Sequence, residues 1–229
     1  MIEKEKEQWR RNDSIAREII GDEKRKEKLI KLGYEIGGKY VPTYWGCAQS
    51  SFLATVDTLR EFGIEILTEN DEKSMFPGFV GLAGGTGNVG IGTCGAVNGA
   101  SFVVSLATNI TIEENARDNS NRWLAFFDVK HYIVEKFIAR WGTIICREIQ
   151  IKKFGMAYDS RNPERSKQLF QMAKVKGCRN LYECTIALGA GWAAEAAWDI
   201  VHRSPGEREW LKEEIKRKQA TDKNIISFW

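Results

Sequence analysis

The architecture of this chain depends on the segment Gly81-Leu82-Ala83-Gly84-Gly85-Thr86-Gly87-Asn88-Val89-Gly90-Ile91-Gly92-Thr93-Cys94-Gly95-Ala96-Val97-Asn98-Gly99-Ala100. The segment lies within a longer stretch, Ser74 to Ile112, that contains no acidic, basic or histidine residue, although 28% of the protein is charged. Nine of the 21 glycines fall between Gly78 and Gly99. Because glycine permits positive φ and close backbone approach, this density indicates tight packing or a backbone wrapped around a ligand.

Helical patterns surround this segment on both sides. Apolar residues at helical spacing predict a helix from Cys47 to about Phe62, and an almost wholly apolar one from Gly95 to Thr108. Further helices are expected at 121–149, kinked near Gly142, from Pro163 to Gly177, and at 181–201. Residues 64–78 and 109–120 are expected to form turns or loops, and no run of alternating strands is convincing. We therefore expect a mainly α fold, a compact helical bundle built around a glycine-rich loop.

The two ends of the chain differ from its centre in composition. Residues 1–40 are dense in charges of both signs and predict one or two surface helices, closed by Gly37-Gly38 and followed by a connector at 41–46. After Pro205-Gly206, a charged helix at 207–218 leads to an apolar tail. The expected division is a charged helical extension at 1–40, a helical domain at 41–204, and a C-terminal helix and tail at 205–229.

Composition restricts the range of partners and compartments. The net charge of +3 is small for 229 residues and gives no reason to expect nucleic acid or an anionic membrane as a partner. The charged N-terminus does not resemble a signal peptide, and the glycines and polar residues of the uncharged stretch argue against a membrane span. We expect a soluble, cytoplasmic protein, and the charged 1–40 segment with the apolar C-terminus favours a homodimer.

Five cysteines are the candidate chemical groups: Cys47, Cys94, Cys146, Cys178 and Cys184. No pair forms C-x-x-C, which excludes a zinc ribbon and the bacterial ferredoxin pattern. Spacing alone favours dispersed, buried cysteines. Position argues the other way, because Cys47, Cys94 and Cys184 fall at expected helix starts, where free N–H groups stabilise a thiolate. Cys146 is expected near the end of the 121–149 helix.

A second candidate motif lies within the glycine-rich loop. Gly85-Thr86-Gly87-Asn88-Val89-Gly90 fits G-x-G-x-x-G, the dinucleotide-binding turn. That motif requires a strand before it and a helix directly after it, and Ile91 to Gly95 is a poor helix opening. The loop is therefore expected to be a packing loop or to surround another ligand, with a nicotinamide-binding enzyme as an alternative.

The cysteine contexts resemble a known family. Cys94-Gly95-Ala96-Val97-Asn98-Gly99 is similar to the C-G-A-x-x-G signature of the C_GCAxxG_C_C family, described as redox-active proteins with four characteristic cysteines. Gly46-Cys47-Ala48-Gln49 resembles that family's N-C-A-Q helix start, with Gly in place of Asn. Cys146 resembles the third cysteine, and either Cys184 or Cys178 resembles the fourth. The resemblance covers about 43–201.

The resemblance implies redox activity without fixing the reaction. A related domain occurs in split-Soret-type cytochromes that carry an iron–sulfur centre, so the resemblance implies that Cys47, Cys94, Cys146 and Cys184, or Cys178, bind an iron–sulfur cluster or another thiophilic metal such as zinc. Backbone N–H groups of the loop would then face the sulfurs, and the residues expected to do so are Gly84, Gly85, Gly87, Gly90 and Gly92.

Two further alternatives are open at this point. Cys47 and Cys94 would be the reactive pair of a metal-free thiol–disulfide oxidoreductase. A non-catalytic helical interaction module would need none of the cysteines. The sequence does not identify the redox partner or the small-molecule substrate.

Overall fold

The computed structural model describes residues 23–173 and 180–221, and within them the chain is helical. The helices are α2 (Glu23–Tyr44), α3 (Cys47–Glu61), α4 (Glu69–Val80), α5 (Gly95–Thr108), α6 (Ile112–Arg117), α7 (Arg122–Val129), α8 (Glu135–Trp141), α9 (Cys146–Phe154), α10 (Pro163–Met172), α11 (Thr185–Val201) and α12 (Pro205–Thr221). No strand occurs among the described residues; one isolated β-bridge joins Thr93 to Ile145. The expected mainly α fold is confirmed. None of the described helices combines the length and apolar content that a bilayer crossing requires.

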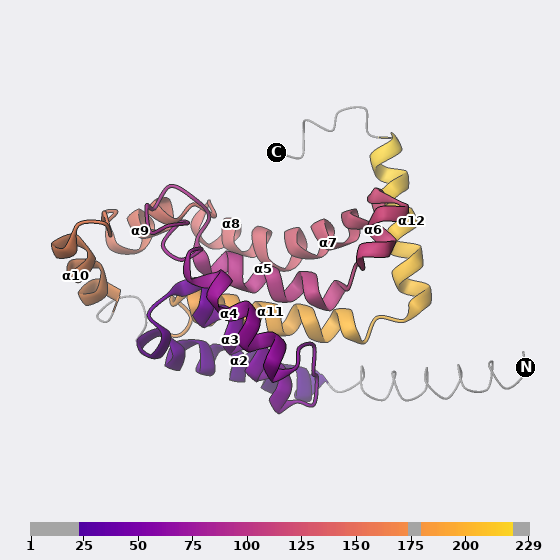
Figure 1. The fold of residues 1–229 in the computed structure, drawn as a ribbon, viewed down its shortest axis with the longest axis horizontal. Helices are drawn as coiled ribbons and strands as arrows, with labels where there is room; N and C mark the ends of the chain where they lie inside the picture. The colour runs from indigo at the N-terminus through magenta and orange to yellow at the C-terminus, as the bar shows by residue number, and fades with distance from the viewer. Residues whose placement is uncertain (1–22, 174–179, 222–229) are drawn as a thin grey trace, which may run out of the picture.

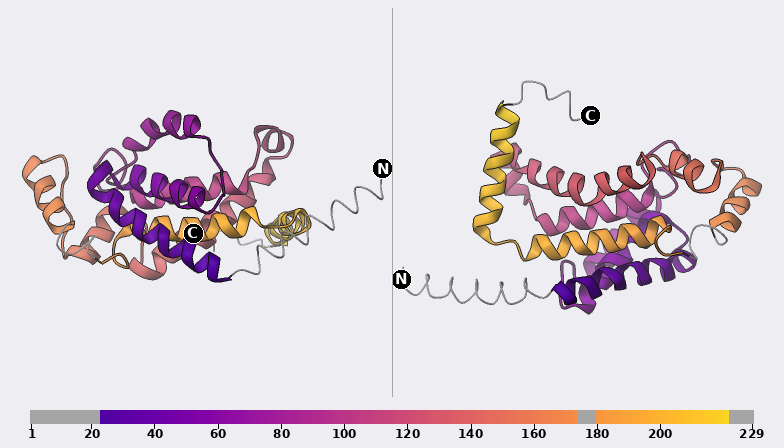
Figure 2. Two further views of the ribbon diagram at one scale, coloured as in Figure 1. Left: turned by 90° about the horizontal axis from the view of Figure 1, so that it is seen from below. Right: turned by 180° about the vertical axis from the view of Figure 1, so that it is seen from behind.

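The alanine-rich helix α11 is the centre of the bundle. Its residues are mostly buried, and it packs against α2, α3 and α5. Figure 1 shows α7 and α8 above α5, with α11 and α2 below it, and the rear view in Figure 2 shows the same order of layers. Helix α12 crosses one end of the bundle, whereas α9 and α10 lie at the opposite end (Figure 1). The helix starts at Cys47, Cys94 and Cys146 lie at that second end, beside α10.

Helix α2 differs from the expected surface helix. It runs through Gly37-Gly38 without a break and ends at Tyr44, so the expected connector at 41–46 shrinks to two residues. The cause is its packing on α11: a Cβ atom at Gly37 would lie 2.7 Å from the Cα atom of Ala187. Small residues thus let the two backbones touch, and tertiary packing outweighs the local helix-stop signal. The helix also crosses the expected domain boundary at residue 40; the division into domains remains a prediction.

The helices α3 and α5 cross at similarly close range. A Cβ atom at Gly99 would lie 2.9 Å from the backbone nitrogen of Phe52 and would also collide with the carbonyl oxygen of Ala48. The hydroxyl of Ser51 donates a hydrogen bond of 3.3 Å to the carbonyl oxygen of Ala96, across the same contact. Both helices were expected with nearly these limits, α3 from apolar residues at helical spacing and α5 from an almost wholly apolar sequence.

Several local expectations were wrong. Residues 69–80 form α4 instead of a turn, started by a reciprocal capping box between Thr68 and Asp71. Residues 112–117 form the short helix α6. The long helix expected at 121–149 is divided: α7 continues through a π-helical turn, Lys130–Val134, into α8, which ends at Gly142 with φ +73°. A new helix, α9, then begins at Cys146, within the region expected to end one helix and start a linker.

The last helix begins at Pro205, two residues before its expected start, and is joined to α6 by ion pairs. Lys212 Nζ lies 3.2 Å from a carboxylate oxygen of Glu114, and Arg208 Nη1 lies 3.3 Å from the same oxygen. The expected end of the 163–177 helix, residues 1–22 and residues 222–229 lie outside the described residues.

Candidate functional site

The glycine-rich loop between α4 and α5 is bonded mainly to itself. The N–H groups of Gly87, Gly90 and Gly92 donate to the carbonyl oxygens of Gly81, Gly84 and Gly85, at 2.7, 2.9 and 3.0 Å. These three N–H groups therefore point into the loop, contrary to the expectation that they would face sulfur atoms. The N–H group of Gly84 does reach sulfur: it donates to the Cys47 Sγ atom at 3.4 Å. Gly84 has φ +62°, a conformation that favours glycine.

The same loop fixes the segment that carries Cys146. The backbone nitrogen of Cys146 donates to the carbonyl oxygen of Gly92 at 3.0 Å, and that of Cys94 donates to the carbonyl oxygen of Ile144 at 2.8 Å. Gly85 lies against Cys146, where a Cβ atom on the glycine would be 2.8 Å from the Cβ atom of the cysteine. Loop closure thus brings together two cysteines that are 52 positions apart in the chain.

Cys47 and Cys94 are hydrogen-bonded to each other. Cys47 is the first residue of α3, and Cys94 is the N-cap residue of α5. The Cys94 thiol donates to the Cys47 sulfur, and this hydrogen bond, with the N–H groups of Gly84 and Gly95, lowers the pKa of Cys47 to about 6 against the opposing effect of burial. The hydrogen bond to Cys47, burial and the charge on Cys47 raise the pKa of Cys94 well above its usual value. At neutral pH the pair holds one thiolate and one thiol.

Gly95 completes this arrangement because a side chain there has no room. A Cβ atom on Gly95 would lie 2.5 Å from Cys47 Sγ and 2.9 Å from the backbone nitrogen of Ala48. Gly95 and Gly99 are separated by one helical turn, so the two glycines present one narrow face of α5 to α3. In the C-G-A-x-x-G segment, the cysteine thus supplies one thiol of the pair, and the two glycines, one helical turn apart, allow the close crossing of α5 and α3 beside it.

Cys146 is the third thiol of the site and differs from the pair. It is buried, and desolvation together with the charge on Cys47 raises the pKa of its thiol to about 11. Its Sγ atom accepts a hydrogen bond from Gln150 Nε2 at 3.4 Å, and Gln150 Oε1 accepts one from the backbone nitrogen of Tyr158 at 2.9 Å. Burial and the charge on Cys47 thus keep Cys146 a neutral thiol, although the hydrogen bond from Gln150 partly opposes them by lowering its pKa.

Cys184 occupies a different place from these three cysteines. Cys184 is the N-cap residue of α11 and is only 1% exposed, in the hydrophobic core that also includes Cys94. Its neighbours Thr185 and Ile186 reach the cavity described below, but Cys184 itself does not line it. Cys178 lies outside the described residues.

Cys47, Cys94 and Cys146 line one cavity with a volume of about 370 Å³. Pockets that bind small molecules start at about 300 Å³. The walls come from the end of α2, the glycine-rich loop, α9, α10 and the start of α11. They are mostly apolar, with Val41, Ile149 and Leu169 among the lining residues. The arrangement is a thiol pair at the wall of a mainly apolar cavity.

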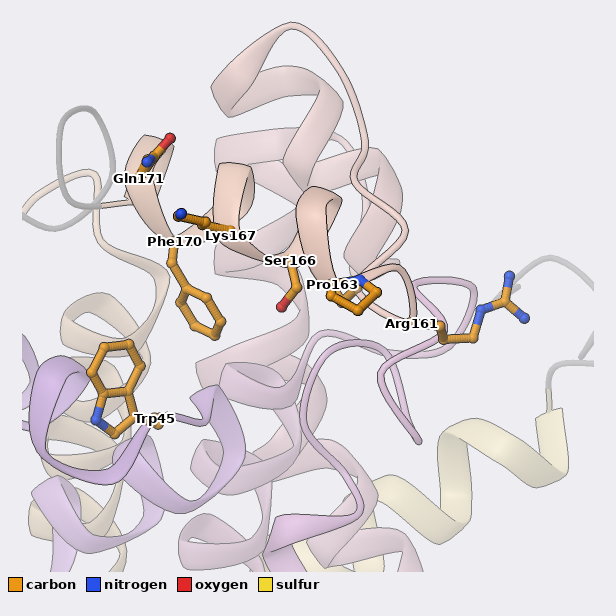
Figure 3. Close-up of a pocket in the computed structure, with 8 residues that line it drawn as sticks. Trp45, Arg161, Pro163, Ser166, Lys167, Phe170 and Gln171 are labelled. Atoms are coloured by element: carbon orange, nitrogen blue, oxygen red, sulfur yellow. The ribbon is translucent and has the colours of Figure 1, made fainter.

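The mouth of this cavity is marked by two aromatic rings. Trp45 and Phe170 meet edge to face with ring centroids 5.2 Å apart, and both also line a more open groove of about 590 Å³. Figure 3 shows the two rings facing each other, while Arg161 extends away from them. Trp45 has φ +53° and is 57% exposed, so its ring is displayed at the surface.

Sequence reasoning missed the contribution of α9. Cys146, Gln150 and Lys153 have the spacing i, i+4 and i+7, and all three line the cavity. Such spacing places side chains on one helix face. This spacing is present in the sequence. It predicts a shared helix face only if a helix begins at Cys146, whereas the sequence analysis placed Cys146 near the end of a helix.

The described donor set does not assemble a metal centre. Nowhere in residues 23–173 and 180–221 do three Cys, His, Asp or Glu side chains gather in a group that could hold a metal ion. Two thiols meet, the third lies at the same cavity bonded to an amide, and the fourth is in the core. This arrangement does not fit the four-cysteine iron–sulfur centre that the resemblance implies, and no step of the chemistry below passes through a metal.

The dinucleotide-binding alternative lacks its structural context. The residues before Gly85 are the last turn of α4 and a series of turns, not a strand, and α5 begins five residues after Gly90. The phosphate-binding form of this motif requires strand, turn and helix in direct succession. Within the described residues, the segment that fits the G-x-G-x-x-G pattern therefore forms a loop that packs around the thiols.

Comparison with known proteins identifies a family. No curated protein and no solved structure matches the chain. A family model described as "Putative redox-active protein (C_GCAxxG_C_C)" matches residues 45–190, which is more than half of the chain and includes the thiol pair, the loop and all the expected cysteines. The chain belongs to the C_GCAxxG_C_C family of redox-active proteins.

Proposed function

We propose that this protein is a thiol–disulfide oxidoreductase in which Cys47 is the attacking thiolate and Cys94 is the resolving thiol. The observation that carries the proposal is the hydrogen bond between the two thiols, with their pKa values shifted in opposite directions. Disulfide exchange needs a thiolate to attack and a second thiol close enough to displace the first product. Family membership supports redox chemistry in general, and this pair gives it a specific form.

The proposed reaction has two steps and transfers two electrons. Cys47 Sγ attacks one sulfur of a disulfide R–S–S–R′, forming a mixed disulfide between Cys47 and R–S while R′–S leaves as a thiolate. Cys94 then loses its proton to the departing thiolate or to solvent, and its sulfur attacks Cys47 Sγ. This attack closes a Cys47–Cys94 disulfide and releases R–S⁻. The substrate is reduced by two electrons, and the protein is oxidised by two.

The surroundings of Cys47 suit the attacking role. The N–H groups of Gly84 and Gly95 stabilise the negative charge on its sulfur, as does its place at the start of α3. Both sulfur-bearing residues line the cavity, but Cys47 is half-buried, whereas Cys94 is buried. The more exposed Cys47 is therefore the thiol assigned to the attack on the substrate.

The proposal is tested by trapping the mixed disulfide. Reduced protein is treated with one equivalent of 2,2′-dithiodipyridine, and the release of thiopyridone and the intact mass are measured. We expect two thiopyridones per wild-type chain and a Cys47–Cys94 disulfide in the peptide map. The Cys94→Ser variant should release one thiopyridone and retain the other on Cys47.

Cys184→Ser provides the matched control, because Cys184 is buried and does not line the cavity. It should behave as the wild type. The proposal fails if Cys47 reacts no faster than glutathione at neutral pH, or if the Cys94→Ser variant still releases two thiopyridones.

Ligation of a thiophilic metal or of an iron–sulfur cluster is a second candidate function. The observation that favours it is that three thiols, Cys47, Cys94 and Cys146, line one cavity with largely apolar walls. It would require a rearrangement that adds at least a third thiol to the pair. Anaerobic purification followed by assays of iron, zinc and acid-labile sulfide tests it. Stoichiometric iron with sulfide, lost in Cys146→Ser, would favour this candidate over the oxidoreductase.

A further inference from the structure

The charge distribution in the thiol cavity points to a class of substrate. Among the described residues that line the cavity, Lys153 is the single cation; the Cys47 thiolate is the one anion, and no carboxylate lines the cavity. Lys153 lies at the end of α9 on the face that also carries Cys146 and Gln150. The cavity therefore has an apolar body with one cation in its wall.

No ion-pair partner of Lys153 is present in residues 23–173 or 180–221. Its Nζ atom lies 5.3 Å from the ring centroid of Phe154, an interaction that holds the ammonium group beside the cavity without neutralising it. Arg161, at the outer groove, makes two side-chain hydrogen bonds to Asp159 at 2.9 and 3.0 Å. Lys153 is thus the cation available to a bound molecule among the described lining residues.

Helix starts add to the positive potential. Cys47 begins α3, Cys146 begins α9, and Thr185 begins α11, and all three residues line the cavity. Helix N-termini favour negative charge because their first N–H groups have no intrahelical partner. This positive potential stabilises the thiolate of Cys47, and it would also stabilise a substrate anion near Lys153.

The remaining walls favour an apolar or aromatic body. Trp45, Phe154 and Phe170 contribute rings, and Val41, Ile149, Leu169 and Ile186 contribute aliphatic surface. A small polar disulfide would leave this surface in contact with water, whereas an aromatic one would cover it.

We propose that the substrate is a small disulfide with an apolar or aromatic body and one anionic group, such as a carboxylate, that pairs with Lys153 while the disulfide bond meets Cys47. The inference rests on the proposed oxidoreductase function and adds the substrate class to it. Lys153 acts in binding and orientation; the sulfur chemistry is that of Cys47 and Cys94, and its products are two thiols, one of which carries the anionic group.

A matched pair of alkylating agents measures the effect of charge alone. Iodoacetate and iodoacetamide are nearly equal in size, and each reacts by attack of the thiolate on the CH₂ carbon with loss of iodide. Both rate constants are proportional to the fraction of Cys47 present as thiolate, so their ratio does not depend on that fraction. We expect the ratio for Cys47 to exceed that for glutathione by about tenfold, the effect of one favourable charge pair near a protein surface.

Two lysines that are neighbours in the chain supply the variants. Lys153→Gln should bring the ratio to within about twofold of the glutathione value, because the charge pair is lost. Lys152→Gln is the control; Lys152 is exposed on α9 and does not line the cavity, so it should leave the ratio unchanged. An equal loss in both variants would overturn the assignment of Lys153 and reduce the effect to general surface charge.

The aromatic part is tested separately with two neutral disulfides. For each thiol, the rate constant with aromatic 2,2′-dithiodipyridine is divided by the rate constant with aliphatic 2-hydroxyethyl disulfide. This ratio should be larger for Cys47 than for glutathione, and Phe170→Ala should reduce the ratio for Cys47. If Cys47 reacts rapidly with every reagent and Lys153→Gln changes no ratio, the substrate class is wrong while the oxidoreductase function stands. If Cys47 reacts with all of them as slowly as glutathione, the oxidoreductase function itself fails.

Discussion

The Cys47 sulfur accepts a hydrogen bond from the Cys94 thiol at the point where α3 and α5 begin. The relationship follows from the fold: Gly95 and Gly99 allow the two helices to cross closely, and the glycine-rich loop brings the N–H group of Gly84 to the same sulfur. A low pKa on one thiol and a high pKa on the other are then two consequences of one hydrogen bond.

The first prediction concerns the pH dependence of Cys47 alkylation. The rate with iodoacetamide should rise with pH, reach half its maximum at about pH 6 and stay constant above pH 8, because only the thiolate reacts and the pKa of Cys47 is lowered to about 6. Measurement of the rate from pH 4.5 to 9, with the modified cysteine identified by peptide mapping, checks this. A half-maximum near the pKa of an ordinary thiol, about 8.5, would contradict it.

Variants of Cys94 test the cause of that shift. Cys94→Ser keeps a hydroxyl that can donate to Cys47, so the half-maximum should stay well below the ordinary value. Cys94→Ala removes the donor, and the half-maximum should move upward. Equal curves for the serine and alanine variants would mean that the hydrogen bond is not the main cause and that the helix start and backbone N–H groups dominate.

The second prediction concerns the close crossing of α3 and α5. Gly95→Ala places a methyl group 2.5 Å from Cys47 Sγ, and it should lower the free energy of unfolding by about 1–3 kcal/mol, the usual cost of overpacking. It should also slow formation of the Cys47–Cys94 disulfide. Urea unfolding monitored by tryptophan fluorescence gives the first quantity, and thiopyridone release gives the second.

Gly78→Ala is the control for this substitution. Gly78 lies in α4, and a Cβ atom there would meet no atom within 4 Å. Because alanine is the better helix former, Gly78→Ala should leave the free energy of unfolding unchanged or raise it by about 0.5–1 kcal/mol. The account of the crossing is wrong if the two substitutions have the same effect.

The third prediction concerns a buried ion pair that joins α7 to the segment just after α11. Asp128 is fully buried and accepts hydrogen bonds from Arg203 at 2.8 and 3.1 Å and from Thr108 Oγ1 at 2.9 Å. Asp128→Ala should lower the free energy of unfolding by about 3–5 kcal/mol, because the Arg203 charge is then buried without its partner. Thermal and urea unfolding of the purified variants measure the loss.

The exposed pair of Asp159 and Arg161 has similar hydrogen bonds and provides the comparison. Asp159→Ala should leave stability almost unchanged, because water screens and replaces that interaction. A small effect of Asp128→Ala would show that water reaches Arg203 in the variant and would contradict the burial argument. Both variants should retain Cys47 reactivity.

The sequence predicted the helices whose apolar pattern coincides with their burial. The expected limits of α5 were confirmed, and those of α3 to within one residue, because most residues in both helices are buried and the chain turns polar or reaches glycine beyond them. Helix α4 was missed because its acidic first turn and Pro77 resemble a turn, although Thr68 and Asp71 have the spacing of a capping box. The limits of α2 could not be predicted locally, because the packing of Gly37 on Ala187 involves residues 150 positions apart.

The candidate site was predictable in part. Cys47 and Cys94 were identified from their helix starts and from the resemblance of their contexts to a family signature, and family membership is confirmed. The predicted place of Cys146, near the end of a long helix, was wrong, because Ile144 and Ile145 continue an apolar pattern across the break at Gly142. Because no helix was predicted to begin at Cys146, Gln150 and Lys153 could not be assigned to the site. The expected metal centre, homodimer and cytoplasmic location stay predictions.

The most direct test of the central claim is a redox titration of the full chain in glutathione buffers, with thiols quenched in acid and mapped by mass spectrometry. The account predicts that Cys47 and Cys94 are lost together in a single two-electron transition, as one intramolecular disulfide, while Cys146 and Cys184 remain reduced. It would be contradicted if Cys47 were only glutathionylated at every ratio, or if the oxidised pair joined Cys47 to a cysteine other than Cys94.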